Sequence, residues 1–222
     1  IRHGEAKLVL IDDQLAAFYQ TIPGDPPTMP MAAVMPGPGK PSGERLELPA
    51  NDPERLVILQ YTSGSTSEPK GVMIPDRVLT ANVDASCAAA ELDTNEVMVS
   101  WLPLYHDMGL IGLLVSSLLV KVPIHLMDPE AFAMRPIRWL RAVSNTGAAY
   151  SGGPCFAYDL CVDRIPEADR AELDLSTWRF AFNGAEPIRP RSLRRFQAAF
   201  GPATGFDGMM PCYGLAEHTL LV

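Results

Sequence analysis

The hydrophobic positions of the chain fall into short β-rich runs that alternate with longer amphipathic segments. The short runs are dominated by apolar and β-branched residues, and we expect strands at 56–61, 71–75, 96–102, 122–127, 148–151, 178–182 and 208–213. Between them, apolar residues recur at helical spacing, which predicts helices at 76–90, 108–119, 135–144, 154–164 and 190–200. This alternation predicts an α/β fold with layered, mostly parallel β-sheets flanked by helices.

Polar residues at the edges of these segments help to define them. Asp76 and Asp107 stand at the start of two expected helices and are the expected N-caps. Before the first of these strands, residues 7–12 are expected to form a buried strand and residues 13–20 a short helix. Residues 22–53 then contain nine prolines and four glycines, which exclude a persistent helix or central strand. We interpret 22–53 as a long surface excursion without a functional site.

Composition narrows the class of protein. The 222 residues are 47% hydrophobic and 20% charged, as in ordinary globular proteins. The net charge of -8 and the lack of a Lys/Arg-rich run argue against nucleic acid as a partner. The arginines at 189, 191, 194 and 195 alternate with apolar residues at helical spacing, which favours a solvated helix face. The longest apolar run, Leu110–Val120, is too short to span a bilayer, so we expect no transmembrane segment.

The four cysteines show no metal-binding or redox spacing. Cys87, Cys155, Cys161 and Cys212 form no C-x-x-C pair and have no histidine nearby at metal-ligand spacing. We therefore expect reduced, buried thiols rather than a zinc site, and a cytoplasmic protein.

The strand expected at 56–61 runs into a loop of small hydroxyl-bearing residues, namely Thr62, Ser63, Gly64, Ser65 and Thr66. Successive N–H groups of such a loop can surround an anion, Gly64 allows close approach, and Lys70 adds a positive charge next to Gly71. A triphosphate would suit this loop. Composition alone favours a solvated turn instead. The Walker spacing does not apply, because five residues separate Gly64 from Lys70.

Three more segments carry candidate chemistry, and each follows an expected strand, where an open α/β sheet gathers its ligands. His106 follows the strand at 96–102, and Gly184 makes a tight turn after the strand at 178–182. Tyr213 and Glu217 lie at the end of the last strand and just beyond it. Taken alone, a histidine at position 106 is more often a structural cap or a core residue, and the turn at Gly184 could equally bind nothing.

Taken as a unit, Thr-Ser-Gly-Ser-Thr-x-x-Pro-Lys-Gly at 62–71 resembles the phosphate-binding signature of the adenylate-forming superfamily. That superfamily includes acyl-CoA synthetases, peptide-synthetase adenylation domains and luciferases. Three more segments resemble its motifs in the family's order, namely His-Asp-Met-Gly at 106–109, Asn-Gly-Ala-Glu-Pro at 183–187 and Tyr-Gly-Leu-Ala-Glu at 213–217. The residues of the last two motifs are similar to those of fatty acyl-AMP ligases.

The resemblance implies ATP and Mg²⁺ as cofactors and assigns roles to particular residues. The catalytic residues would be His106, beside the reacting carboxylate, and Lys70. Glu217 would bind magnesium, and Tyr213 would stack on adenine. The nucleotide site would comprise Thr62, Ser63, Gly64, Ser65, Thr66, Lys70, Gly71, Asn183, Gly184, Ala185, Glu186, Tyr213, Gly214, Leu215, Ala216 and Glu217. The acyl substrate would contact His106, Asp107, Met108, Ser151 and Gly152.

The chain also departs from the family's patterns. Ala216 stands where most of the superfamily has a threonine that donates to the α-phosphate, and Ser67 replaces a common glycine. Gly152-Gly-Pro-Cys155 stands where the ligases more often have Ala-Pro-Asn. This last change leaves the shape of the acyl tunnel open.

The implied activity is ATP-dependent conversion of a fatty acid to acyl-AMP with release of pyrophosphate. The acyl group would pass to the phosphopantetheine thiol of an acyl carrier protein or polyketide synthase, in lipid or polyketide biosynthesis. The alternatives are a fatty acyl-CoA ligase and a non-catalytic nucleotide-binding or carrier-docking fragment. The resemblance further implies that residues 1–222 are part of a large N-terminal AMP-binding domain, inactive alone. A ribose-binding aspartate and a C-terminal lid domain with a catalytic lysine would then lie outside them.

Overall fold

The computed structural model describes residues 8–11, 26–30, 33, 50–62 and 70–221. The chain divides into two compact units, residues 1–52 and 53–222, which are described separately. In the first unit, β1 (Val9–Ile11) pairs in parallel with β2 (Thr28–Pro30). The strand predicted at 7–12 is therefore present, but it is half-exposed rather than buried. The helix predicted at 13–20 and most of the proline-rich stretch lie outside the described residues.

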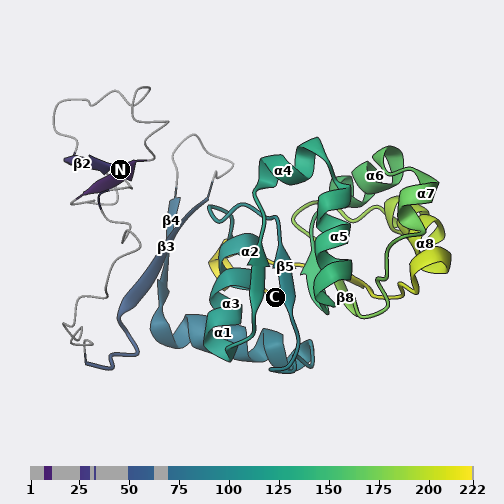
Figure 1. The fold of residues 1–222 in the computed structure, drawn as a ribbon. Coiled ribbons are helices and arrows are strands. Elements are labelled where there is room, and N and C mark those ends of the chain that lie inside the picture. Colours follow the sequence, from purple (N-terminus) through teal and green to yellow (C-terminus); the bar gives the residue numbers. More distant parts are fainter. Residues whose placement is uncertain (1–7, 12–25, 31–32, 34–49, 63–69, 222) are drawn as a thin grey trace, which may run out of the picture. The chain divides into compact units, whose positions relative to one another are not determined.

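The second unit begins with the two strands predicted at 56–61 and 71–75, which form a hairpin (Figure 1). β3 (Leu56–Thr62) and β4 (Lys70–Pro75) are antiparallel, and Thr62 pairs with Lys70. Helix α1 (Asp76–Ala89) follows β4 without a loop, so Pro75 is the N-cap residue and the prediction of Asp76 as the cap is wrong. Asp76 lies in the first turn, where its carboxylate still favours the helix N-terminus.

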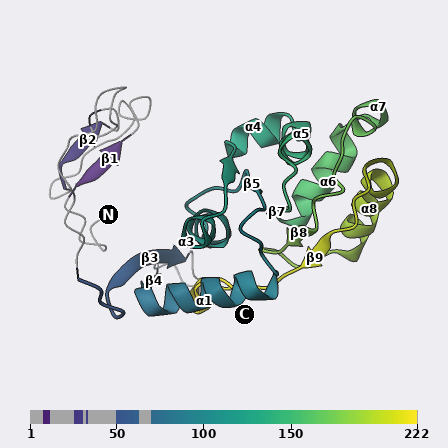
Figure 2. The same cartoon turned by 60° about the horizontal axis from the view of Figure 1, so that its bottom comes forward.

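The other strands form one parallel sheet of five, in the order β6-β5-β7-β8-β9 (Figure 2). They are β5 (Met98–Ser100), β6 (Ile124–Leu126), β7 (Tyr150–Gly152), β8 (Phe180–Asn183) and β9 (Met209–Pro211). Each is shorter than its hydrophobic run predicted, because the paired backbone covers only part of that run. Parallel pairing throughout this sheet confirms the predicted α/β class.

Helical segments connect these strands. The stretch after β5 is helical from residue 107 to 120, with α2 (Asp107–Gly109), a π-helix η2 (Leu110–Val115) and α3 (Ser116–Val120). The predicted helices at 135–144, 154–164 and 190–200 are confirmed as α5 (Ile137–Thr146), α6 (Cys155–Arg164) and α8 (Pro190–Thr204). Two short helices were not predicted, α4 (Pro129–Met134) and α7 (Glu167–Arg170).

The order of the strands creates a switch point between β5 and β7. β6 lies on one side of β5, and the chain then crosses to form β7 on the other side. Connections from such neighbouring strands leave the sheet in opposite directions, which opens a crevice at their carboxyl ends. The segment that contains His106 follows β5 directly, so the topology brings it to this crevice.

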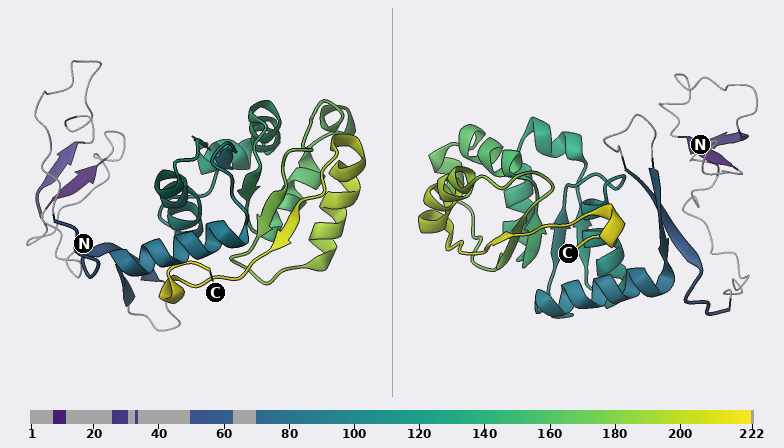
Figure 3. Two further views of the ribbon diagram at one scale, coloured as in Figure 1. Left: turned by 90° about the horizontal axis from the view of Figure 1, so that it is seen from below. Right: turned by 180° about the vertical axis from the view of Figure 1, so that it is seen from behind.

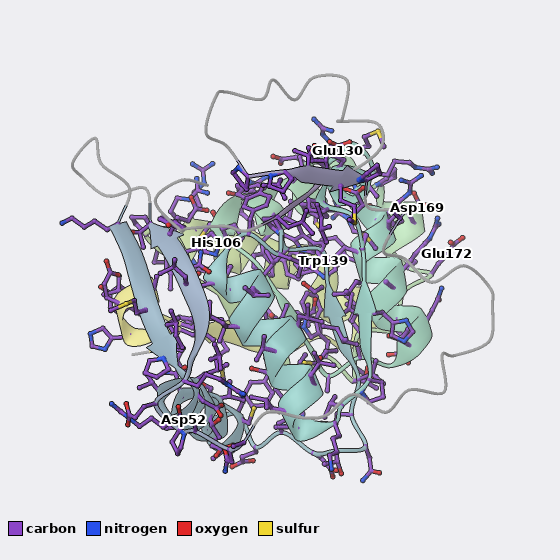
Figure 4. All side chains as sticks on the ribbon, turned by 90° about the vertical axis from the view of Figure 1, so that its left-hand side faces the viewer. Asp52, His106, Glu130, Trp139, Asp169 and Glu172 are labelled. Carbon is purple, nitrogen blue, oxygen red and sulfur yellow. The ribbon has the colours of Figure 1, made fainter. Side chains whose placement is uncertain are left out.

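The core is built around aromatic side chains, with Trp139 of α5 at its centre (Figure 4). Trp139 is fully buried, and its ring meets those of Trp101, Phe132, Tyr158 and Trp178 at centroid distances of 5.3–5.8 Å. Its indole Nε1 donates to the Ser151 Oγ on β7 at 2.7 Å. The tryptophan therefore joins α5 to the sheet by packing and by a buried hydrogen bond.

The arginine-rich helix α8 is amphipathic as predicted. Phe196 and Phe200 are fully buried against the core. On the other face, Arg195 pairs with Asp159 at 2.8 Å and with Asp163 at 2.5 Å. Arg195 thus joins α8 to α6 at the surface.

The four cysteines are free thiols, with Cys155 and Cys161 buried and Cys87 and Cys212 half-buried. Burial raises the pKa of the Cys161 thiol, which makes it unreactive. Within the described part of the chain, no helix has the length and apolar character needed to cross a bilayer.

Candidate active site

A cavity of about 1010 Å³ lies in the second unit. It is lined by the end of β3, the C-terminal half of α1, the stretch from Tyr105 into α3, the pleated sheet face and the segment after β9. Ten predicted site residues line it, namely Thr62, His106, Asp107, Met108, Ala185, Tyr213, Gly214, Leu215, Ala216 and Glu217. The structure therefore brings parts of all four motifs to one cavity.

The phosphate-binding motif is described only at its two ends. Ser63, Gly64, Ser65 and Thr66 lie outside the described residues. Lys70 and Gly71 do not line the cavity, but Lys70 pairs across the hairpin with Thr62, which does. Gln60 of β3 donates from Nε2 to the Tyr105 carbonyl at 3.3 Å, which ties the hairpin to the segment before His106. Lys70 thus stands beside the cavity, at the base of the predicted phosphate loop.

Two predicted acyl-site residues lie inside the sheet rather than in the cavity. Ser151 is fully buried, and its Oγ accepts from Trp139 and donates to the Val99 carbonyl at 2.6 Å. A Cβ on Gly152 would collide with the Phe182 carbonyl of the neighbouring strand. In this arrangement both residues serve the packing of β7, and their contact with substrate stays a prediction.

The predicted adenine-binding turn follows β8. Its left-handed residue is Ala185, with φ 65°, so the prediction that Gly184 makes the turn is wrong by one residue. Gly184 is needed for space instead, because a Cβ there would lie 2.8 Å from the Cys212 Sγ. A left-handed alanine is strained by about 1–3 kcal/mol, and such strain is concentrated at functional sites. Ala185 is the member of this turn that lines the cavity.

The polar residues of this turn are engaged in structural bonds. Asn183 is fully buried, and its Nδ2 donates to the Gly153 carbonyl at 3.2 Å. The Glu186 carboxylate accepts from the backbone N–H of Phe156 at 3.0 Å, in the first turn of α6, where the helix dipole favours an anion. These contacts hold the turn between β7 and α6, and they leave Ala185 to face the cavity.

His106 begins the helical stretch after β5. Its backbone is extended and makes it the N-cap of α2, so the prediction that Asp107 is the cap is wrong. Its Nδ1 lies 2.7 Å from the Asp107 Oδ1, which also accepts from the Met108 backbone N–H at 2.7 Å. The contact with Asp107 orients the ring. In the charged imidazole Nδ1 donates to the carboxylate, and in the neutral ring Nδ1 instead accepts from the Met108 N–H at 3.2 Å. In both forms a ligand would meet Nε2. Gly109 is required in this turn, because a Cβ would lie 2.5 Å from the Pro103 carbonyl.

The His106–Asp107 pair favours the charged form of both groups. The hydrogen bond to Asp107 raises the pKa of His106, although partial burial acts against it. Burial of the Asp107 carboxyl would raise its pKa, but the hydrogen bond and the charge of His106 bring that pKa below its ordinary value. His106 is therefore a cation at a higher pH than an isolated histidine, which suits contact with a carboxylate substrate.

We expect Asp107→Asn to lower the pKa of His106. The pair's contribution to stability is complete only between the ordinary pKa values, roughly pH 4 to 6.5. It fades as pH rises through the raised pKa of His106, and as pH falls through the lowered pKa of Asp107. NMR titration of the His106 ring in wild type and Asp107→Asn checks this. Because His106 is about half-exposed, the stability term should stay below about 1 kcal/mol. Identical titration curves would contradict the expectation.

The segment that carries Tyr213 and Glu217 is held against α1 (Figure 3). Asn82 of α1 donates from Nδ2 to the carbonyls of His218 at 3.1 Å and Leu221 at 3.0 Å, and its Oδ1 accepts from the Leu221 N–H at 3.4 Å. Sequence reasoning missed Asn82, because its partners lie 136 and 139 residues away. The one available signal in the sequence was that Asn82 is a polar residue within an otherwise amphipathic helix.

Glu217 fits the implied magnesium role in part. Its carboxylate is exposed and lines the cavity. Mg²⁺ is commonly held by one or two carboxylates together with the phosphates of a nucleotide, so a single carboxylate would hold it only where a nucleotide supplies the other oxygens. Within the described residues, no cluster of three His, Cys, Asp or Glu side chains forms a metal site without such phosphates.

Fold and site together define a nucleotide-dependent α/β enzyme domain of the adenylate-forming type. The model of the AMP-binding enzyme family matches residues 1–222, and the chain belongs to this family. The family predicted from the four motifs is thereby confirmed.

Within this family, the chain is similar to ligases of fatty acids. The chain is 44% identical over 181 residues to the medium-chain-fatty-acid–[acyl-carrier-protein] ligase JamA of Moorena producens. The aligned residues make up 81% of this chain and 30% of that protein. It is 39% identical over 187 residues to the probable long-chain-fatty-acid–AMP ligase FadD30 of Mycobacterium tuberculosis, which covers 80% and 32%. The fatty acyl-adenylate ligase of L. pneumophila, solved with acyl adenylate and pyrophosphate, superposes with a TM-score of 0.86 at 35% identity, covering 98% of this chain and 38% of that chain. The chain spans about a third of the length of these relatives.

Proposed function

We propose that the whole protein activates a fatty acid to acyl-AMP with ATP and releases pyrophosphate. The observation that carries the proposal is one cavity into which the hairpin end, the His106 turn, the Ala185 turn and the Glu217 segment converge. Similarity to ligases that act on fatty acids supports the choice of acid. Apart from His106, Asp107 and Glu217, the residues that line the cavity are uncharged, as an alkyl chain requires.

In the proposed reaction a carboxylate oxygen attacks the α-phosphorus of ATP, and the bond to pyrophosphate breaks. The cationic His106 ring, oriented by Asp107, holds the carboxylate at the cavity. The exposed ring of Tyr213 offers a face for adenine, with the backbone at Ala185 beside it. Lys70 offsets charge on the phosphates. Mg²⁺, when bound at Glu217, would supply further neutralisation of those phosphates.

The phosphopantetheine thiol of an acyl carrier protein or polyketide synthase then loses its proton and attacks the acyl carbonyl, and the acyl–phosphate bond breaks to release AMP. The carrier-protein ligase among the relatives supports this acceptor. Ala216, in place of the usual threonine, and the Asn183-Gly-Ala-Glu-Pro187 wording support it as well. The second candidate is transfer to CoA.

Product analysis of the full-length protein tests both steps. Given fatty acid, ATP, magnesium and CoA, it should exchange pyrophosphate into ATP and accumulate acyl-AMP with little acyl-CoA. Addition of a carrier protein should then yield acylated carrier. Rapid conversion to acyl-CoA would overturn the choice of acceptor, and absence of exchange would overturn adenylation itself.

Glu217→Gln should raise the magnesium concentration needed for half-maximal exchange by about tenfold or more, because it removes one anionic ligand at nearly constant volume. Magnesium titration of the full-length enzyme measures this. Glu130→Gln, an exposed glutamate of α4, is the matched control and should match wild type. If Glu217→Gln also matches wild type, the metal ligand lies elsewhere.

A further inference from the structure

Part of the cavity is an apolar pocket between the sheet and the end of α1. Its sheet wall is formed by Met98, Tyr150 and Phe180, which are paired side by side on β5, β7 and the start of β8. Cys87 and Ala90, at the C-terminal end of α1 and just beyond it, also line this pocket. The three sheet residues are at most 9% exposed, so this wall is closed to solvent.

Tyr150 closes the pocket where α1 meets the sheet. Its hydroxyl donates to the Ala90 carbonyl, so the ring bridges the sheet and the end of the helix. The same hydroxyl accepts from the Arg179 guanidinium at 3.1 Å. With these bonds made, the hydroxyl is directed into the wall, and the cavity meets the ring.

Phe180 and Arg179 reinforce this closure. The Tyr150 and Phe180 rings are stacked, with centroids 4.7 Å apart and planes 5° apart. The Arg179 guanidinium carbon lies 5.4 Å from the Tyr150 centroid and 4.8 Å from the Phe180 centroid, and Arg179 does not line the cavity. An ion pair with Glu96 at 2.6 Å holds the arginine in place. The pocket therefore ends at two rings backed by an ion pair.

The helix α1 provides a length scale. Asn82 holds the segment that carries Glu217, and Ala90 receives the Tyr150 hydroxyl. The two residues are eight positions apart, Asn82 within α1 and Ala90 just beyond its end, which is about 12 Å along the helix axis. The Tyr150 hydroxyl therefore meets α1 about 12 Å further along the helix axis than the bonds that hold the Glu217 segment, and a medium-length alkyl chain spans a similar length.

We propose that the stacked pair of Tyr150 and Phe180 is the chain-length stop of this enzyme, which would select medium-chain saturated fatty acids over long-chain ones. The inference rests on the proposed adenylation function. Beyond that function, the inference specifies the chain length of the fatty acid and the two residues that limit it. A pair with a purely structural role would alter stability when replaced, but it would not alter the choice between acids of different length.

The test is a competition among equimolar octanoate, decanoate, dodecanoate and hexadecanoate in the full-length enzyme, with acyl-AMP products quantified by mass spectrometry. Wild type should favour decanoate over hexadecanoate. Tyr150→Ala should raise the hexadecanoyl-to-decanoyl ratio by about tenfold or more, since even one methylene admitted to an apolar pocket changes discrimination by about tenfold or more. The ratio does not depend on the fraction of enzyme that is folded.

Tyr150→Phe is the matched control, because it keeps the ring and removes both hydroxyl bonds. Its ratio should stay within about twofold of wild type. Phe180→Leu removes the second ring of the pair and should lengthen the pocket to a smaller extent. It replaces Tyr150→Ala in the test if that variant does not fold. Unchanged ratios in the opened variants, or a wild-type preference for hexadecanoate, would overturn the stop. Absence of acyl-AMP from every acid would instead overturn the proposed function.

Discussion

Replacing Trp139 with alanine should lower the free energy of unfolding by about 3–5 kcal/mol, the usual cost of removing a large aromatic ring from a packed core. Trp139 is fully buried and is surrounded by four other aromatic rings, so little can move into the space it leaves. The Ser151 Oγ also loses its buried donor. Denaturant unfolding of the wild-type and variant proteins, followed by circular dichroism, measures the difference.

Trp139→Phe separates packing from hydrogen bonding. It keeps an aromatic ring between α5 and the sheet but removes the indole N–H. The loss in free energy of unfolding should therefore be clearly smaller than for Trp139→Ala. The Ser151 hydroxyl keeps its bond to the Val99 carbonyl in both variants. A loss below about 1 kcal/mol for Trp139→Ala would mean that the core can close around the missing ring.

Replacing Lys70 with alanine should lower kcat/KM for ATP in the full-length enzyme by roughly 10- to 100-fold. A hydrogen bond to a charged group contributes about 1.5–3 kcal/mol, and phosphate is such a group. Lys70 stands opposite Thr62, at the base of the predicted phosphate loop, and its side chain is exposed and available to a ligand. Steady-state kinetics with varied ATP measure the effect, and KM for the fatty acid should change little.

Two lysine variants serve as controls. Lys70→Arg keeps the positive charge and should retain more activity than Lys70→Ala. Lys121→Asn removes a lysine that lies outside the cavity, and asparagine tolerates the left-handed backbone at that position. It should match wild type. If the ATP dependence of Lys70→Ala is also unchanged, the segment after β3 is a solvated turn rather than a phosphate site.

The chain by itself determined its elements and its family. Hydrophobic period is a local signal, and it located each strand of the five-stranded sheet to within a few residues. It missed α4 and α7, which are too short to show a period. The motifs around His106 and Glu217 are also local, so their assignment needed no tertiary contacts. The local sequence pattern placed the N-caps at Asp76 and Asp107, one residue too late. The N-cap is the last residue with extended backbone before the helix, and the sequence pattern alone does not show which residue that is.

Tertiary structure alone decided which of these residues meet. Strand order brought the end of β5 to the switch point, and the return of the chain after β9 brought Glu217 to α1 through Asn82. It also buried Ser151 and Asn183, which sequence reasoning had assigned to ligands. The Tyr150 hydroxyl bonds to the Ala90 carbonyl, 60 residues away. Such contacts arise only when distant segments pack, so no window of sequence contains them.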